Sequence, residues 1–199
     1  MEIEYKNDKI KLEKELNLLD KLVINFTSKL NKFGLGYVIV SGYVSILFGR
    51  SRSSEDIDLI IEKITNNQFQ NLWHELSKDF ECITTSNPQE ALKEYLLANH
   101  AIRFSIKNNF IPNIEIKFPK NELDLWTLKE RKEVILNKNK LFISPLELQI
   151  PFKLFLGSEK DVEDAKYLYK IFKDKIDLKI MQEFNRKLKI EHLFNRYIK

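Results

Sequence analysis

The fold of this sequence is decided by Val40-Ser41-Gly42-Tyr43 and, shortly afterwards, by Gly49-Arg50-Ser51-Arg52-Ser53-Ser54-Glu55-Asp56-Ile57-Asp58-Leu59. Acids and aliphatics alternate at the end of the second segment, which is typical of a strand with one buried face. Residues two apart on a strand point to the same side, so the carboxylates of Asp56 and Asp58 should stand next to each other. Two adjacent carboxylates repel each other unless a cation lies between them, and hard oxygen ligands suit Mg²⁺. The pair therefore predicts a metal site.

The first segment predicts a phosphate-binding turn. Tyr37–Ser41 is apolar and β-branched, as in a buried strand, and Gly42–Phe48 has the pattern of a short helix that starts directly after it. The backbone N–H groups at such a junction attract phosphate, and Gly42 leaves room for it. Arg50 and Arg52 lie on the loop before the acids, where their guanidinium groups match phosphate oxygens. Together these features suit phosphoryl or nucleotidyl transfer.

Hydrophobic periodicity extends the prediction along the chain. Apolar residues spaced along 8–32 predict an amphipathic helix, which Gly34 and Gly36 end. Further strands are expected at Asp56–Ile61, Ala101–Ile106, Asn113–Phe118 and Lys140–Ile143, the middle two as a hairpin. Further helices are expected at Thr65–Lys78, from Asn87-Pro88 onward, and at Thr127–Val134.

The last quarter of the chain predicts only helices. Ser144-Pro145-Leu146-Glu147 resembles a capping box, and its helix should reach about Gly157 with a kink at Pro151. Helices at 159–173 and 177–189 and a short basic end follow. The sequence thus predicts an α+β (mixed α/β) core at 1–143, with a mixed sheet flanked by helices and an N-terminal helix, and a helical region at 144–199.

Composition excludes several classes of protein. Of 199 residues, 43% are hydrophobic and 31% are charged, so the chain can form a core and is not of disordered composition. No apolar run is long enough to cross a bilayer, and the N-terminus does not resemble a secretory signal. Cys82 is the only cysteine, which excludes an internal disulfide and favours a cytoplasmic location. The histidines lack the spacing of zinc ligands, and the net charge of +4 permits an anionic substrate without demanding one.

The ordered motifs resemble the nucleotidyltransferase superfamily that includes DNA polymerase beta. Its signature is a Gly-Gly or Gly-Ser turn, then Asp-x-Asp or Asp-x-Glu between hydrophobic residues, then a third acid on a later strand. Val40-Ser41-Gly42, Asp56-Ile57-Asp58 and Ile114-Glu115-Ile116 are similar to these three elements. The wider pattern is closest to the branch of abortive-infection toxins and uncharacterised microbial homologues. Its downstream lysine and Lys-Asp-x-x-Asp motif are matched by Lys153 and by Lys160-Asp161-Val162-Glu163-Asp164.

The resemblance implies a Mg²⁺-dependent nucleotidyltransferase with a nucleotidyltransferase-type mixed sheet. It implies two ions, Mg²⁺ or alternatively Mn²⁺, one held by Asp56 and Asp58 on the triphosphate and one by Asp58 and Glu115 beside an acceptor hydroxyl. Glu115 would also help to remove the hydroxyl proton. Nucleotide contacts are expected from a further set of residues: Ser41, Gly42, Arg50, Arg52, Lys153, Asp161 and Asp164.

The resemblance also implies partners. The donor would be a nucleoside triphosphate such as ATP, GTP or CTP, and the acceptor an RNA such as tRNA, a protein or a small molecule. A role as a toxin of a toxin–antitoxin or phage-defence pair, with an antitoxin protein as partner, follows from the same branch. Two departures from the family pattern stand out. Ser41 replaces the first glycine of the turn, and Gly157-Ser158-Glu159 lacks the arginine common before the Lys-Asp-x-x-Asp segment.

Other interpretations remain open at this stage. A non-catalytic descendant that binds a nucleotide or a partner protein is favoured by Ser41 and opposed by the retained acids. A basic RNA-binding module would use the segment 186–199. Arg50 and Arg52 also fit ordinary surface residues, and Asp161 and Asp164 also fit helix capping or pairing with Lys160.

Overall fold

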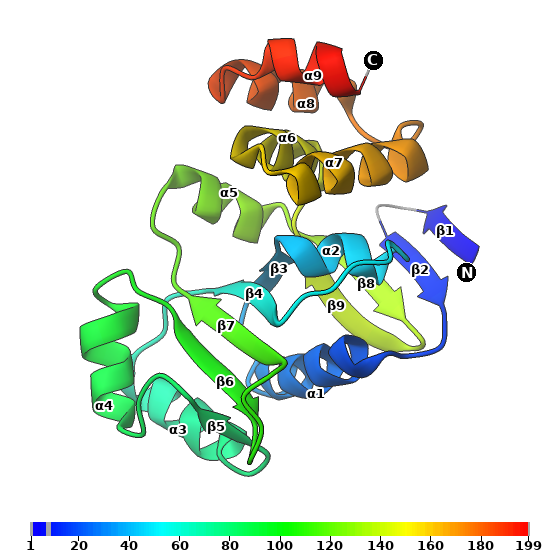
Figure 1. Ribbon diagram of the computed structural model, residues 1–199. Helices are drawn as coiled ribbons and strands as arrows, with labels where there is room; N and C mark the ends of the chain where they lie inside the picture. Colours follow the sequence, from blue (N-terminus) through cyan, green and yellow to red (C-terminus); the bar gives the residue numbers. More distant parts are fainter. Residues whose placement is uncertain (1, 7–8, 199) are drawn as a thin grey trace.

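The computed structural model describes residues 2–6 and 9–198, and within these ranges nine strands form one mixed sheet in the order β1-β2-β8-β9-β3-β4-β7-β6-β5 (Figure 1). The strands are β1 (Glu2–Lys6), β2 (Lys9–Glu13), β3 (Tyr37–Val40), β4 (Asp56–Ile61), β5 (Phe80–Cys82), β6 (Ile102–Ile106), β7 (Asn113–Lys117), β8 (Lys132–Leu136) and β9 (Asn139–Ile143). The helices are α1 (Leu18–Lys32), α2 (Gly42–Leu47), α3 (Asn66–Leu76), α4 (Pro88–Glu90) with a π-helical segment η1 (Ala91–Leu96), α5 (Glu122–Lys129), α6 (Leu146–Leu156), α7 (Glu159–Phe172), α8 (Leu178–Lys187) and α9 (Glu191–Tyr197). This is the predicted mixed α/β class with C-terminal helices.

The register of the central strands brings the acids of the sequence pattern together. β3 and β4 are antiparallel, with Val40 opposite Asp58, and β4 and β7 are parallel, with Asp58 opposite Glu115. The predicted hairpin of β6 and β7 is confirmed, and Arg103 lies opposite Glu115 on it. Side chains directly opposite on neighbouring strands are close enough to interact. Three strands therefore place Asp58, Glu115 and Arg103 in one row across the sheet.

Helices cover the two faces of the sheet differently. α1 packs against one face, where Phe26 contacts Phe104 of β6 with ring centroids 5.8 Å apart. Ile57 and Leu59 of β4 are fully buried in the same core. Figure 1 shows α2 and α5 on the other side of the central strands, with α6 and α7 beyond α2 and with α8 and α9 outermost. The carboxylates thus face the side on which the C-terminal helices lie.

The predicted N-terminal helix is wrong over its first half. Lys9–Glu13 is a strand whose side chains alternate, with Ile10 and Leu12 buried and their neighbours exposed. The alternation typical of a strand is hard to recognise here, because the leucines that follow it also fit the spacing of a helix. The helix begins only at Leu18, after an Asn17 cap that pairs reciprocally with Asp20. The first residue of the predicted helix, Asp8, lies outside the described residues.

Two predictions near the end of the core are also wrong. The segment 127–134 is not one helix, because α5 ends at Lys129 and Lys132–Leu136 is strand β8 between β2 and β9. The predicted capping box at Ser144 does not form. Pro145 is the cap residue without a side-chain bond, and the carboxylate of Glu147 accepts a hydrogen bond from the backbone N–H of Asp177 at 3.2 Å. Glu147 therefore joins α6 to α8.

The helical prediction for the rest of the C-terminal part is confirmed. α6 contains Pro151 and ends at Gly157, whose φ of 72° suits glycine, and α7 and α8 follow within the expected ranges. The basic end forms a ninth α-helix of the described chain, α9. Within the part of the chain that the structure describes, every helix is too short or too polar to span a bilayer.

Candidate active site

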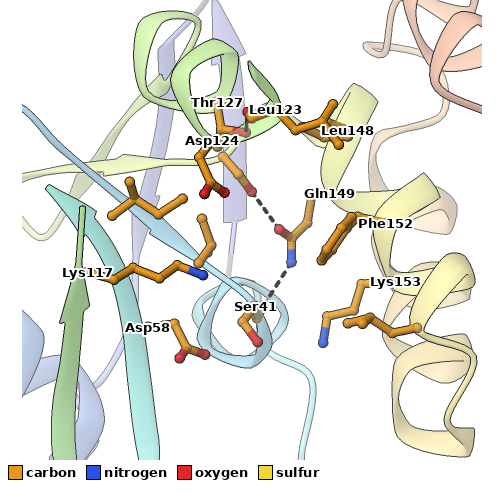
Figure 2. A pocket seen from close by; sticks show the side chains of 14 residues that line it. Ser41, Asp58, Lys117, Leu123, Asp124, Thr127, Leu148, Gln149, Phe152 and Lys153 are labelled. Carbon is orange, nitrogen blue, oxygen red and sulfur yellow. Dashed lines mark hydrogen bonds between the residues drawn. The ribbon is translucent and has the colours of Figure 1, made fainter. Parts of the chain in front are cut away.

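The turn between β3 and α2 keeps a backbone conformation that normally requires glycine. Ser41 has φ 65° and ψ −139°, a region in which side chains are strained. Its carbonyl oxygen accepts a hydrogen bond of 2.8 Å from the amide of Gln149 on α6, and Gln149 accepts one of 2.6 Å from the hydroxyl of Ser144 (Figure 2). The strained turn is therefore held from the C-terminal helical region.

Asp56 and Asp58 lie on the same face of β4, as the alternation predicted. The pKa of Asp58 is raised from 3.8 to about 6, first because burial disfavours its charged form and second because Asp56 is negatively charged. Glu115 adds further repulsion, whereas the hydroxyl of Ser41 and the charge of Lys117 lower the pKa. The two aspartates thus form a strained, partly buried pair of like charges.

Glu115 faces Asp58 from β7 but is engaged in an ion pair. Arg103 donates from Nε and Nη2 to Glu115 Oε2 at 2.9 and 2.8 Å. Among residues 2–6 and 9–198 no group of three or more acidic, histidine or cysteine side chains is arranged so as to hold a metal ion. The structure brings the three predicted acids to one face, and the chemistry of Asp56 and Asp58, two crowded oxygen donors, fits a hard divalent cation.

The predicted nucleotide contacts from the loop before β4, from α6 and from α7 form one ionic network, which we call the Asp164 network. It consists of Arg50, Arg52, Lys153, Asp161 and Asp164. Arg50 pairs with Oδ1 of Asp164, and Arg52 pairs with its Oδ2 at 2.5 Å. Lys153 lies 2.5 Å from Asp161 and 3.0 Å from Asp164. Asp164 is completely buried and Lys153 is 2% exposed.

Gly42 connects this network to the turn. A Cβ atom placed on Gly42 would lie 3.1–3.2 Å from the guanidinium group of Arg52, which is tighter than an ordinary contact. The lack of a side chain at Gly42 therefore allows Arg52 to lie directly against the start of α2. Six of the seven predicted nucleotide contacts are thus linked in space, by contact with Arg52 or by the network, and Ser41 adjoins them.

A pocket with a cavity volume of about 180 Å³ opens beside Asp58. Its floor is the sheet face at Val40, Ser41, Asp58, Ile60 and Lys117. Its walls come from α5, from α6 and from Ser144, two residues before α6: Leu123, Asp124, Thr127, Ser144, Leu148, Gln149, Phe152, Lys153 and Leu156. Figure 2 shows Asp124 and Thr127 across the pocket from Ser41 and Asp58. One wall is thus largely apolar, and Asp58 lies at one end.

Several of these residues escape sequence reasoning. Gln149, Lys117, Asp124 and Phe152 sit within ordinary helix or strand patterns, and only the fold brings them to Asp58. Arg103 offered one signal, because the predicted hairpin places β6 opposite Glu115. Phe152 is 40% exposed although it is aromatic, and only the folded structure shows that it lines the pocket.

Comparison with known proteins supports the fold and nothing finer. No protein-family model matches the chain, and no curated protein matches its sequence. An antigenic nucleotidyltransferase-like protein from Paracoccidioides brasiliensis is similar over 90% of this chain and 93% of its own, at 17% identity and a TM-score of 0.56. The crystal structure of ANT(2")-Ia in complex with adenylyl-2"-tobramycin is similar over 86% of this chain and 97% of its own, at 10% identity and a TM-score of 0.53. The chain therefore has a nucleotidyltransferase-like fold.

Proposed function

We propose that this protein is a Mg²⁺-dependent nucleotidyltransferase that moves a nucleoside monophosphate from a nucleoside triphosphate to a hydroxyl group of a small molecule. One observation carries the proposal: Asp56 and Asp58 share a sheet face next to the Ser41–Gly42 turn, where burial and, after it, the charge of Asp56 raise the pKa of Asp58 to about 6. A pair of repelling carboxylates is costly to keep unless a cation compensates it.

Asp56 and Asp58 are the residues that would hold Mg²⁺ on the triphosphate, and Asp58 with Glu115 would hold a second ion. Bound Mg²⁺ would neutralise phosphate charge and favour ionisation of the attacking hydroxyl. Glu115 can serve the second ion only after its ion pair with Arg103 opens or rearranges. Mn²⁺, which also takes oxygen ligands, is expected to substitute.

The protein's own groups account for the other steps of the reaction. The acceptor oxygen attacks the α-phosphorus, the bond from that phosphorus to the bridging oxygen of pyrophosphate breaks, and the hydroxyl proton passes to a carboxylate, for which Glu115 is our candidate. Pyrophosphate would leave on the side of Ser41 and Gly42. Arg52, whose guanidinium lies against Gly42, would stabilise the negative charge of the leaving pyrophosphate, and so would Lys153.

The pocket beside Asp58 favours a small acceptor. At about 180 Å³ it admits a ring or a short chain, not a folded macromolecule, and its apolar wall suits a partly apolar molecule. ANT(2")-Ia, which shares the fold, was solved with an adenylylated small molecule, adenylyl-2"-tobramycin. A toxin role with tRNA or protein as acceptor and an antitoxin as partner rests on the sequence resemblance alone, and we rank it second.

The non-catalytic alternative is less well supported. It was favoured by Ser41 in place of glycine, but Ser41 adopts a backbone conformation typical of glycine, and Gln149 holds its carbonyl. Replacing glycine by serine at this position is therefore compatible with an intact turn.

Incubation with each α-labelled nucleoside triphosphate, Mg²⁺ and a panel of small hydroxyl compounds tests the proposal. We expect label transfer with release of pyrophosphate by the wild type, and a loss of at least about 10³-fold in Asp56→Ala. Equal transfer by the wild type and by Asp56→Ala would rule out this metal site. Binding of a triphosphate without transfer to any small compound, RNA or protein would favour the non-catalytic descendant.

A further inference from the structure

The Asp164 network joins the loop before β4 to the C-terminal helices through a single carboxylate. Oδ1 of Asp164 pairs with Arg50, and Oδ2 pairs with Arg52 at 2.5 Å and Lys153 at 3.0 Å. Asp164 has no exposed surface, whereas the side chains of Arg50 and Arg52 are 18% and 16% exposed. A nucleotide can therefore reach the arginines but not the carboxylate that holds them.

Two hydrogen bonds and a close approach to Gly42 fix the orientation of the Arg52 side chain. Its Nε donates to the carbonyl of Ser53 at 3.3 Å, and its Nη1 donates to Asp164. Its Nη2 lies 3.1 Å from the position that a Cβ on Gly42 would take. A Cβ on Gly42 would lie at nearly equal distances, 3.1–3.2 Å, from Nη2, Cζ and Nη1, so the flat face of the guanidinium lies against Gly42. The contacts to Ser53 and Asp164 thus hold this group beside the Ser41–Gly42 turn, where the proposed function places pyrophosphate.

The network also keeps a positive charge beside that turn. Three cationic groups face two carboxylates in it, so one positive charge is left uncompensated. Arginine side chains lose much conformational freedom when they bind an anion, and a group already fixed in place has lost it beforehand. A buried anchor behind the arginines therefore strengthens their binding of phosphate by holding them in one orientation.

We propose that Asp164 is a positioning residue that aims Arg52, together with Arg50, at the β- and γ-phosphates of the bound triphosphate, without touching the nucleotide. This rests on the proposed function, because it assumes that a triphosphate binds at the Ser41–Gly42 turn. It gives α7 a defined task in substrate binding and places Asp164 behind the contact residues.

Net charge and side-chain orientation predict opposite effects when the Asp164 carboxylate is removed. Asp164→Asn removes a negative charge next to a polyanion site, and Coulomb attraction by itself would then raise the affinity for phosphate. By contrast, the loss of a fixed orientation of Arg50 and Arg52 would lower the affinity for phosphate. We expect a loss of about 10- to 100-fold in affinity, as is typical when one member of a buried charged hydrogen-bond network is removed.

The experiment is calorimetric titration of the full chain with ATP, GTP, CTP or UTP plus Mg²⁺, and in parallel with inorganic tripolyphosphate. The fitted stoichiometry gives the folded fraction, so loss of fold is separated from loss of affinity. Asp164→Asn should weaken binding of the triphosphate and of tripolyphosphate by similar factors, because the lost contacts are to phosphate. Glu163→Gln, on the exposed side of the same helix where Glu163 pairs with Lys166 at 3.0 Å, is the matched control and should bind like the wild type.

Asp164→Glu keeps the proposal testable if Asp164→Asn does not fold. It retains the buried charge but moves the carboxylate by one methylene, so its affinity should fall between those of the wild type and the asparagine variant. Unchanged or tighter binding per folded molecule, in either variant, overturns the positioning role. Failure of the wild type itself to bind any triphosphate contradicts the proposed function instead, so the two failures are distinguishable.

Discussion

Two groups of charged side chains lie on either side of the Ser41–Gly42 turn, and they are built in opposite ways. In the Asp164 network every cation has a carboxylate partner, and Asp164 itself is completely buried. On β4, Asp56 and Asp58 repel each other, and the pKa of Asp58 is raised to about 6. Removing one partner of a buried ion pair is strongly destabilising, whereas like charges held together are costly unless a ligand compensates them. The comparison indicates that Asp164 holds the cations of the network in place, whereas the two aspartates need a bound cation to compensate their charge.

Lys153→Ala should have the largest effect on stability. It leaves Asp161 and Asp164 without the lysine that contacts both, and removing one partner of a buried ionic network costs about 3–5 kcal/mol of unfolding free energy. Urea denaturation measures the loss. The control is Lys166→Ala, which removes a partly exposed pair with Glu163 and should change stability by less than about 1 kcal/mol. Equal effects of the two substitutions would mean that the network is not structural.

The next effect concerns pH and the aspartate pair. Because the folded-state pKa of Asp58 lies above its usual value of 3.8, protonated Asp58 stabilises the folded state, and this contribution is lost as the pH rises from about 4 through about 6. Without divalent ions, stability should fall by about 2 kcal/mol over that window, after allowance for partial solvent screening. Asp58→Asn should flatten this part of the pH–stability curve. A wild-type curve that already rises over the window would contradict the like-charge account.

Arg103→Ala tests whether Glu115 belongs to the aspartate group. The pair is half-exposed on the arginine side, so its loss should change stability by less than about 1 kcal/mol. A freed Glu115 should raise the affinity for Mg²⁺ several-fold in titration calorimetry, because one carboxylate becomes available. If Arg103→Ala and Glu115→Gln both bind Mg²⁺ like the wild type, Glu115 is not a metal ligand.

The smallest effect is expected at the turn between the two groups. Ser41→Gly relieves a backbone conformation that costs a non-glycine residue of the order of 1 kcal/mol, so thermal unfolding should shift upwards slightly. The substitution also removes the hydroxyl that lowers the pKa of Asp58, which should therefore rise above about 6. A destabilised Ser41→Gly protein would show that the serine contributes more than its strain costs.

The sequence predicted one group better than the other for a physical reason. Asp56 and Asp58 are two residues apart on one strand, so the pleat alone places them together. Glu115 is expected only from the family resemblance, and the parallel pairing of β4 with β7 brings it opposite Asp58. Arg50 and Asp164 are 114 residues apart, and no local pattern indicates that they pair. Hydrophobic spacing is ambiguous where a strand precedes a helix: Ile10 and Leu12 alternate as in a strand, whereas the leucines that follow fit helical spacing. Contacts set by the whole topology, such as Gln149 with Ser41, had no signal in the sequence.

The most direct test of the account is an NMR titration of the Asp58 carboxyl group with and without Mg²⁺. We expect a pKa of about 6 in the metal-free protein and a large fall with saturating Mg²⁺. Without metal, we expect a lower pKa in Asp56→Asn, which lacks the neighbouring charge. A pKa near 4 in the metal-free protein, or one that Mg²⁺ leaves unchanged, would contradict the claim that these two aspartates bind a divalent ion.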